Sequence, residues 1–153
     1  MKQTAAVAVF NTPTIQAEAV VTPRKRGSTM RVKIRKLPAG EHGFHIHRAG
    51  DLRGKGCVGA CSHFHAGRRQ VTHGGPPGTR RGRHSGDLGN IRSTRKNYRY
   101  YLPDVKPSML WGRSLIIHAD RDDLGRGPHE DSKTTGHSGA RIGCAIFGRG
   151  MDC

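Results

Sequence analysis

Two histidines, His45 and His47, stand two residues apart in the first third of the chain. If this segment is a strand, both imidazoles project from the same face, because side chains alternate along an extended backbone. Zinc and copper both accept imidazole ligands, so the pair could bind one metal ion. The same spacing is also typical of histidines that are only solvated or hydrogen-bonded, so a metal site requires further donors.

A second group of candidate ligands follows in a glycine-rich stretch, in which several histidines precede a single aspartate. The group consists of His63, His65, His73, His84 and Asp87. Three imidazoles and one carboxylate provide the four donors that a tetrahedral zinc ion accepts. Metal bonds between distant residues would also offset the entropy lost when such a stretch becomes ordered. We therefore favour a metal site over a flexible, basic, histidine-containing loop.

His118 ends an apolar run and is followed by an acidic segment that includes Asp120, Asp122 and Asp123. A carboxylate near a metal-bound histidine can accept its remaining N–H and fix the orientation of the ring. The segment therefore predicts one more ligand with a supporting carboxylate. A solvated acidic turn is the alternative.

Short strands are the elements that must position these residues. Apolar and basic side chains alternate from Met30 to Leu37, which predicts a half-buried strand. Other short runs between turn residues predict strands at residues 4–10, 15–22, 42–47, 98–102, 112–118 and 141–147. Because helical periodicity is missing from the sequence, the pattern indicates an all-β antiparallel sandwich or barrel.

Residues 51–90 show neither the period of a strand nor that of a helix. A loop of this length inside a compact domain requires something that orders it, usually a metal ion or a disulfide. The chain of 153 residues fits a single domain, residues 1–153. No run approaches the roughly 18 apolar residues of a membrane span, and no secretory leader is recognised, so we expect a cytoplasmic or otherwise intracellular protein.

The formal net charge of +16 concentrates anions near the surface, which favours small anions, nucleic acid or acidic surfaces as partners. The cysteines at positions 57, 61, 144 and 153 lack the two-residue gap of a zinc ribbon or a redox motif. Histidines must therefore provide any metal site.

These segments resemble copper/zinc superoxide dismutase in order and approximate spacing over nearly the whole chain. The resemblance rests on HGFHIH at 42–47, GC at 56–57, HF at 63–64, HGGP at 73–76, HSGDLGN at 84–90, GR at 112–113, His118, DDLG at 122–125 and GARIGC at 139–144. It implies a Greek-key β-sandwich or barrel, immunoglobulin-like, with long metal-binding and electrostatic loops. It also implies an oxidoreductase, an antioxidant enzyme that disproportionates superoxide to oxygen and hydrogen peroxide.

The resemblance implies a copper ion and a zinc ion as cofactors. Copper would be held by His45, His47, His63 and His118, and zinc would be held by His63, His73, His84 and Asp87. His63 would bridge the two ions as an imidazolate and would also be catalytic, because it can supply a proton. Zinc does not change its oxidation state, so it would fix the loop and tune His63.

Further roles follow from the same resemblance. Asp122 would accept hydrogen bonds from His45 and His73, and Cys57 would form a disulfide with Cys144.

The second catalytic residue that the resemblance implies is Arg141, whose guanidinium has a permanent charge and a rigid fork of donors that would orient superoxide at copper. Lys133 resembles a residue of the family's charged channel loop, although it is displaced by one position.

Several features depart from the family. The gaps from His63 to His73 and from His73 to His84 are each about two residues longer, and residues 77–83 are strongly basic; loop length itself adds little entropy, so metal binding should persist. In residues 95–101, basic and aromatic residues alternate, which could suit nucleic acid, although an exposed basic strand is the simpler interpretation.

The partners other than superoxide are less well defined. The family dimerises through apolar residues, but here Ala49 and Arg149 occupy such positions, so a homodimer stays open. A copper chaperone is another expected partner. Cys61 and Cys153 are additional cysteines, and His65 is an additional histidine, and none of these three has an assigned role.

Two other function classes compete with the enzyme. A metal carrier or chaperone-like domain would use the same fold without turnover, but such domains tend to lose copper ligands or the arginine, and this chain keeps both. A basic module that binds nucleic acid or another polyanion would use its metals only for structure, which the complete copper set disfavours.

Overall fold

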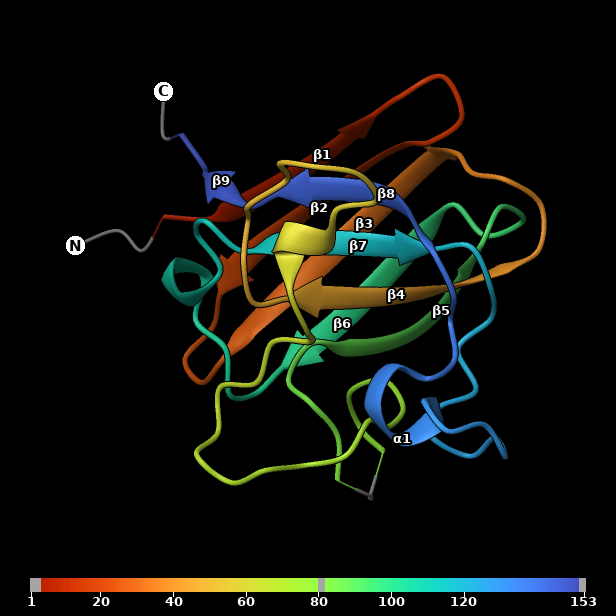
Figure 1. Cartoon of the computed structure of the whole chain (residues 1–153). Coiled ribbons are helices and arrows are strands. Elements are labelled where there is room, and N and C mark those ends of the chain that lie inside the picture. Colours follow the sequence, from red (N-terminus) through yellow and green to blue (C-terminus); the bar gives the residue numbers. More distant parts are fainter. Residues whose placement is uncertain (1–3, 80–81, 152–153) are drawn as a thin grey trace.

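The computed structural model describes residues 4–79 and 82–151 of the chain. Within this part, nine strands form two antiparallel sheets, and helical structure is limited to three elements of one turn (Figure 1). The strands are β1 (Ala6–Asn11), β2 (Gln16–Pro23), β3 (Ser28–Lys36), β4 (Glu41–His47), β5 (Asp87–Arg92), β6 (Asn97–Leu102), β7 (Ser114–His118), β8 (Arg141–Ile146) and β9 (Gly148–Arg149). The helical elements are η1 (Val58–Ala60), η2 (Pro107–Met109) and α1 (Ser132–Thr135).

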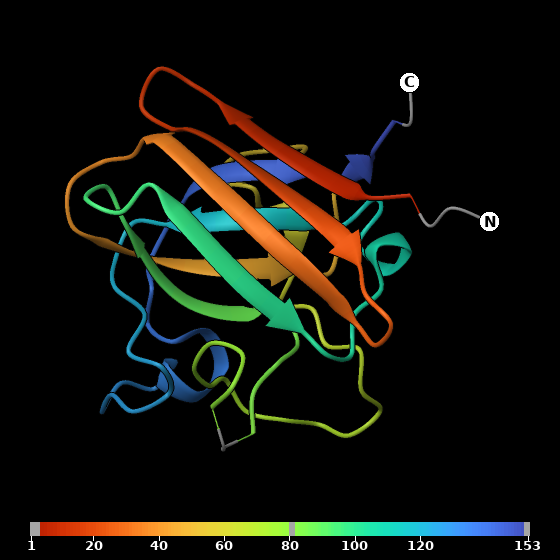
Figure 2. The ribbon, with the colours of Figure 1, turned by 180° about the vertical axis from the view of Figure 1, so that it is seen from behind.

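The first sheet has the strand order β6-β3-β2-β1-β9. In β3, Met30, Val32 and Ile34 are buried, whereas the side chains between them are exposed. The half-buried strand predicted from this alternation is confirmed. β3 therefore turns one apolar face to the core and one strongly basic face outward, and Figure 2 shows no long loop crossing the outer face of this sheet.

The second sheet has the strand order β5-β4-β7-β8. All five residues of β7 and six of the seven residues of β4 are buried, because the core covers one face and the long loops cover the other. The two central strands pair in register, with His45 opposite Ile116 and His47 opposite Ser114. β4 and β7 are therefore the rigid elements on which a buried site can be built.

The core lies between the two sheets. Large side chains that are fully buried there include Phe44, Met30, Leu115 and Phe147. Full burial of each such side chain contributes about 1.5–3 kcal/mol. The all-β sandwich that the sequence indicates is confirmed, and no helix in the described part of the chain has the length and apolar character needed to cross a membrane.

The segment expected to be irregular, residues 51–90, differs from that expectation at its end. β5 begins at Asp87 and pairs with β4, with a register irregularity between Gly43 and His45. Because Asp87, Leu88 and Gly89 are all buried, β5 lacks the alternation that would reveal a strand. Strands exist at the seven predicted positions, with ends shifted by one or two residues, but β5 and β9 were missed.

The long loop after β4 is attached to the sheet along its length. A disulfide joins Cys57 to Cys144 in β8, across 87 residues of sequence. Further along the loop, the Phe64 N–H donates to the Ile46 carbonyl at 2.8 Å, and the Gly86 N–H donates to the Phe64 carbonyl at 2.9 Å. These bonds fix the position of His63 relative to the histidines of β4.

Candidate metal centre

Four histidines converge on the outer face of β4 and β7. His45 and His47 lie on the same side of β4, His118 ends β7, and His63 is held beside His47 by an isolated bridge. All four are buried, and one ring nitrogen from each lies within 4.8 Å of the others. The expectation that alternate residues on a strand bring His45 and His47 together is confirmed.

The four nitrogens that face one another have no hydrogen-bond partner within the described chain. They are Nδ1 of His45 and Nε2 of His47, His63 and His118. A buried polar atom without a partner is costly, so such a cluster requires an explanation. Four converging imidazole nitrogens with free lone pairs form a donor set that suits a transition metal such as copper or zinc.

The second ring nitrogens of these histidines explain why the lone pairs face inward. His47 Nδ1 donates to the Cys61 carbonyl at 2.8 Å, and His118 Nδ1 donates to the Gly139 carbonyl at 3.1 Å. A carbonyl oxygen only accepts, so the proton of each neutral ring lies on Nδ1 and the lone pair lies on Nε2. The backbone thereby selects the tautomer that binds metal.

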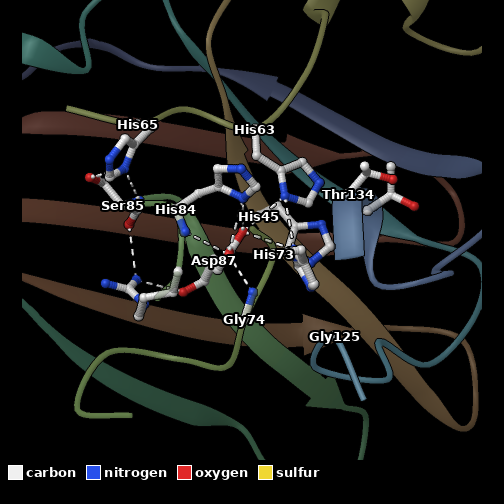
Figure 3. A network of polar contacts seen from close by, with 12 residues as sticks. His45, His63, His65, His73, Gly74, His84, Ser85, Asp87, Gly125 and Thr134 are labelled. Carbon is white, nitrogen blue, oxygen red and sulfur yellow. Dashed lines mark hydrogen bonds and ion pairs between the residues drawn. The ribbon is translucent and has the colours of Figure 1, made fainter. Parts of the chain in front are cut away.

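A second group shares one histidine with the first. His63, His73 and His84 direct Nδ1 toward Asp87, at 2.9, 3.1 and 3.2 Å from its Oδ1, respectively (Figure 3). The Nδ1 atoms of His63 and His73 are 3.2 Å apart. Donors around a tetrahedral zinc ion with bonds of 2.0–2.1 Å lie about 3.3 Å apart, and these four distances are close to that spacing.

Asp122 links the two groups from behind. One of its carboxylate oxygens accepts from His45 Nε2 at 2.6 Å, and the other accepts from His73 Nε2 at 2.8 Å. Asn90 holds the aspartate in place, because its side chain accepts from the Asp122 N–H at 2.7 Å and donates to the Asp122 carbonyl at 2.9 Å. The predicted contacts of Asp122 with both histidines are present, whereas the bracing by Asn90 was not predicted.

Burial and charge set the protonation of the four histidines in the first group, His45, His47, His63 and His118. Burial lowers the pKa of His118 to about 4, and neighbouring charged groups contribute less. Burial likewise lowers the pKa of His45, His47 and His63. These rings are therefore neutral at neutral pH, which is the form that binds a metal ion.

For His73 and Asp87 of the second group, hydrogen bonds outweigh burial in their effect on the pKa. Burial by itself would lower the pKa of His73, but its hydrogen bonds to Asp122 and Asp87 outweigh this effect and raise the pKa to about 9. Burial would raise the pKa of Asp87, but hydrogen bonds from His63, His73 and His84 hold it well below its usual range. In the metal-free chain His73 is therefore protonated at neutral pH, and its positive charge lies beside the Asp87 carboxylate.

Arg141 lies at the start of β8, where it is the cross-strand partner of His118 of β7, next to a register irregularity between Ile117 and His118. Its two terminal nitrogens donate to the carbonyls of Cys57 and Cys61 at 2.7 and 2.6 Å. The Cys61 carbonyl therefore holds both the guanidinium and His47. Cys61 has a backbone φ of +62°, in the left-handed region, and its exposed thiol is free.

Other polar residues support the site although the sequence interpretation gave them no role. His42 is buried between the carbonyls of His118 and Pro38, at 2.8 and 3.0 Å. His65 lies outside both metal groups, and its Nδ1 accepts from the Ser85 N–H at 3.1 Å. His42 lies in the motif HGFHIH and Asn90 lies in the motif HSGDLGN, both of which resemble the superoxide dismutase family. Their presence in these motifs could have indicated a supporting role. Cys153 lies outside the described residues, as do positions 80 and 81 of the basic loop.

The family description "copper/zinc superoxide dismutase (SODC)" matches residues 14–147 of this chain. The chain belongs to the copper/zinc superoxide dismutase family. A protein named as a Cu-Zn superoxide dismutase in Orgyia pseudotsugata multicapsid polyhedrosis virus is 47% identical over 119 residues, which are 73% of this chain and 75% of that protein. The extracellular Cu-Zn superoxide dismutase of Haemonchus contortus is 43% identical over 78% of this chain and 66% of its own length.

A solved structure shares the architecture of this superoxide dismutase family member. It is a crystal structure of the clock protein EA4, with a TM-score of 0.81 and 34% sequence identity, and the match covers 97% of this chain and 96% of that chain. The predicted fold class, enzyme class and pair of metal cofactors are confirmed by the family match, and the structure has two groups of residues that could hold metal ions.

The expectation of a cytoplasmic or otherwise intracellular superoxide dismutase is wrong. A relative that is 43% identical is an extracellular enzyme. The disulfide between Cys57 and Cys144 is a feature that persists most readily in oxidising compartments. Composition and apolar runs describe the folded chain and carry no information about its compartment.

Proposed function

We propose that this chain disproportionates superoxide at a copper ion held by one histidine group, with a zinc ion held by the other. His45, His47, His63 and His118 would bind copper, and His63, His73, His84 and Asp87 would bind zinc. The observation that carries the proposal is the set of four buried imidazole nitrogens that face one another without partners. When bound, copper supplies one-electron oxidation and reduction of superoxide, and zinc supplies a positive charge that does not change oxidation state.

His63 is the residue that we assign to proton transfer. Its Nδ1 is directed toward Asp87, while its Nε2 faces the copper group and has no protein partner. In the metal-free chain burial lowers the pKa of this imidazole, so the ring is neutral and its Nε2 would be free to take up a proton and give it to reduced superoxide. Asp87, which belongs to the same zinc group as His63, lies 2.9 Å from the other ring nitrogen.

Arg141 is the residue that we assign to substrate binding. Two carbonyls hold its terminal nitrogens beside the strand that carries His118, and superoxide is a small anion that a guanidinium can orient. The disulfide fixes the loop that provides one of these carbonyls. The arginine is thus preorganised and does not have to be ordered by each substrate molecule.

The test is the rate of superoxide loss catalysed by protein loaded with copper and zinc. We expect His118→Ala to lower the rate at least 100-fold, because it removes a copper ligand, whereas His129→Ala in an exposed part of the chain should leave it unchanged. Arg141→Ala should lower the rate about 10-fold at low superoxide, and Arg69→Ala, with the same charge change, should have little effect. A fully metal-loaded parent protein without activity would overturn the proposal.

The extent and the partners of the enzyme complete the proposal. We propose that residues 1–153 form one domain, which is supported by a family match that leaves out only short segments at both ends.

Trp111 and Ile146 expose apolar surface near β9, where Arg149 lies over the indole ring, so a homodimer through this region is a second hypothesis. Light scattering of Ile146→Glu beside the parent tests it. A copper chaperone as partner stays a prediction from the resemblance.

A further inference from the structure

The outer face of the five-stranded sheet carries a basic surface that the metal centre does not use. Its residues come from β3, β6 and the turn before β6, and all are exposed: Arg31, Lys33, Arg35, Arg95 and Arg99. We call this group the basic face. Figure 2 looks onto the sheet from behind the metal centre and shows these strands uncovered.

The strand register places two arginines of the basic face directly opposite each other. Arg31 of β3 is the cross-strand partner of Arg99 of β6. Like charges in this arrangement destabilise a sheet. The one acid that lines this surface, Glu18 of β2, lies opposite Lys33 and is 3.8 Å from a terminal nitrogen of Arg35. Neither arginine of the opposed pair has an ion-pair partner within the described chain.

The basic face surrounds a shallow groove of about 470 Å³. Half-buried Val20 contributes apolar atoms to its lining, together with the small exposed parts of Val32 and Tyr98, and charged side chains and Asn97 contribute the rest. The Arg95 guanidinium lies over the Tyr98 ring, 4.5 Å from its centre. An occupant with both anionic groups and flat apolar groups would match this lining.

We propose that the basic face binds single-stranded nucleic acid through its phosphodiester backbone. Arginine forks bind phosphate bidentately, and the opposed Arg31 and Arg99 could share one phosphate, which would remove their repulsion. Bases unstacked from a single strand can lie on the apolar lining or against guanidinium planes. A sulfated polysaccharide has the charge but lacks the flat apolar groups, and a duplex keeps its bases stacked inside.

The structure also shows which side chains of residues 95–101 could contact a nucleic acid. Tyr98 and Tyr100 of β6 point into the core, with 8% and 9% of their surface exposed. In residues 95–101 the basic residues and Tyr101 are therefore exposed, whereas Tyr98 and Tyr100 lie on the inner face. Phosphate contacts dominate binding, so affinity should depend weakly on base sequence and strongly on salt.

The experiment titrates the metal-loaded protein into a fluorescently labelled oligothymidylate of about twelve nucleotides and measures anisotropy at several salt concentrations. Arg31→Gln/Arg99→Gln should weaken binding at least 10-fold and reduce the slope of log affinity against log salt by about 0.7, which corresponds to the loss of the one phosphate that the two arginines share. The matched control, Arg68→Gln/Arg69→Gln, removes the same charge from an exposed loop and should weaken binding less than twofold. Unchanged superoxide dismutase activity in both variants confirms that they are folded.

Three outcomes would overturn the proposal. Equal weakening by the two double variants would mean that only net charge matters. Tighter binding of a duplex of the same length, or of heparin at the same charge concentration, would assign the basic face to another polyanion. Failure of the parent protein to bind the oligonucleotide at low salt would leave the basic face without a nucleic-acid ligand.

Discussion

Each imidazole of the metal centre has two nitrogens with separate tasks. In His47 and His118, one nitrogen donates to a backbone carbonyl and the other faces the copper group without a partner. The residue types of the ligands could be predicted from the sequence, because histidine spacing and the resemblance both point to them. The tautomers could not, since they depend on the Cys61 and Gly139 carbonyls, which belong to distant loops.

The pH dependence of the metal-free protein tests this description of the buried rings. Burial lowers the pKa of His118 to about 4 in the folded chain, whereas the ring titrates near 6.5 when unfolded. Above pH 6.5 both states are neutral and the group contributes nothing. As the pH falls from 6.5 toward 4, only the unfolded state takes up the proton, so the free energy of unfolding decreases.

We therefore expect the metal-free parent to lose roughly 2–3 kcal/mol more stability than His118→Gln between pH 7 and pH 4.5. Urea denaturation at the two pH values measures the difference. An identical loss in both proteins would show that His118 is not buried as a neutral ring in the absence of metal.

At the scale of elements, three strands and two loops provide the residues of the two groups. β4 and β7 supply histidines in fixed register, β5 begins with Asp87, and the loops after β4 and β7 supply the other candidate ligands and Asp122. The strands could be predicted from alternation, as β3 shows. β5 could not, because its first three residues are buried on both faces and the first of them, Asp87, has the chemistry of a ligand rather than of a strand residue.

The loop that follows α1 offers a test of close packing around Asp122. Gly136 has a φ of +72°, and a Cβ there would lie 2.0 Å from Asp122 Oδ1 and 2.5 Å from His73 Nε2. Gly78 has a φ of +98°, with nothing within 4 Å of its Cβ position. Both Gly→Ala changes should cost about 1–2 kcal/mol of backbone strain.

Only Gly136→Ala should also weaken zinc binding, by about 10- to 100-fold, because it displaces the carboxylate that orients His73. Chelator competition with a zinc-sensitive dye gives the affinity of each variant. Equal zinc affinities in the two variants would mean that the contact with Asp122 does not matter.

The disulfide connects stability and substrate binding through one loop. We expect Cys57→Ser/Cys144→Ser to lower the stability of the metal-free protein by about 4 kcal/mol, since the closed loop spans 87 residues. Activity of the metal-loaded variant should also decrease, because the Cys57 carbonyl holds Arg141. Thermal unfolding and superoxide loss are the two measurements. Full activity at unchanged metal content would argue against the proposed role of the loop.

At the scale of the whole molecule, the net charge of +16 acts on every anion that approaches. Superoxide dismutase is itself an established example of electrostatic steering, so only the salt dependence in this chain is predicted here. The rate at low superoxide should fall several-fold as ionic strength rises from about 0.01 to 0.15 M, where the screening length shortens from about 30 to 8 Å. A rate independent of salt would mean that the excess charge has no part in catalysis.

The sequence predicts the total charge of the molecule but not where the charges lie on its surface. Composition gives the total charge, but the register of β3 and β6 decides that Arg31 and Arg99 meet on the face away from the copper ligands. The compartment was predicted wrongly, because neither charge nor apolar runs report it.

The most direct test of the central claim, that His63 serves both metal sites, is the copper and zinc content of each variant after dialysis against both ions. The parent should hold one ion of each metal. His118→Ala should lose copper and keep zinc, His84→Ala should lose zinc and keep copper, and His63→Ala should lose affinity for both. Retention of either metal at the parental affinity in His63→Ala would contradict a shared ligand.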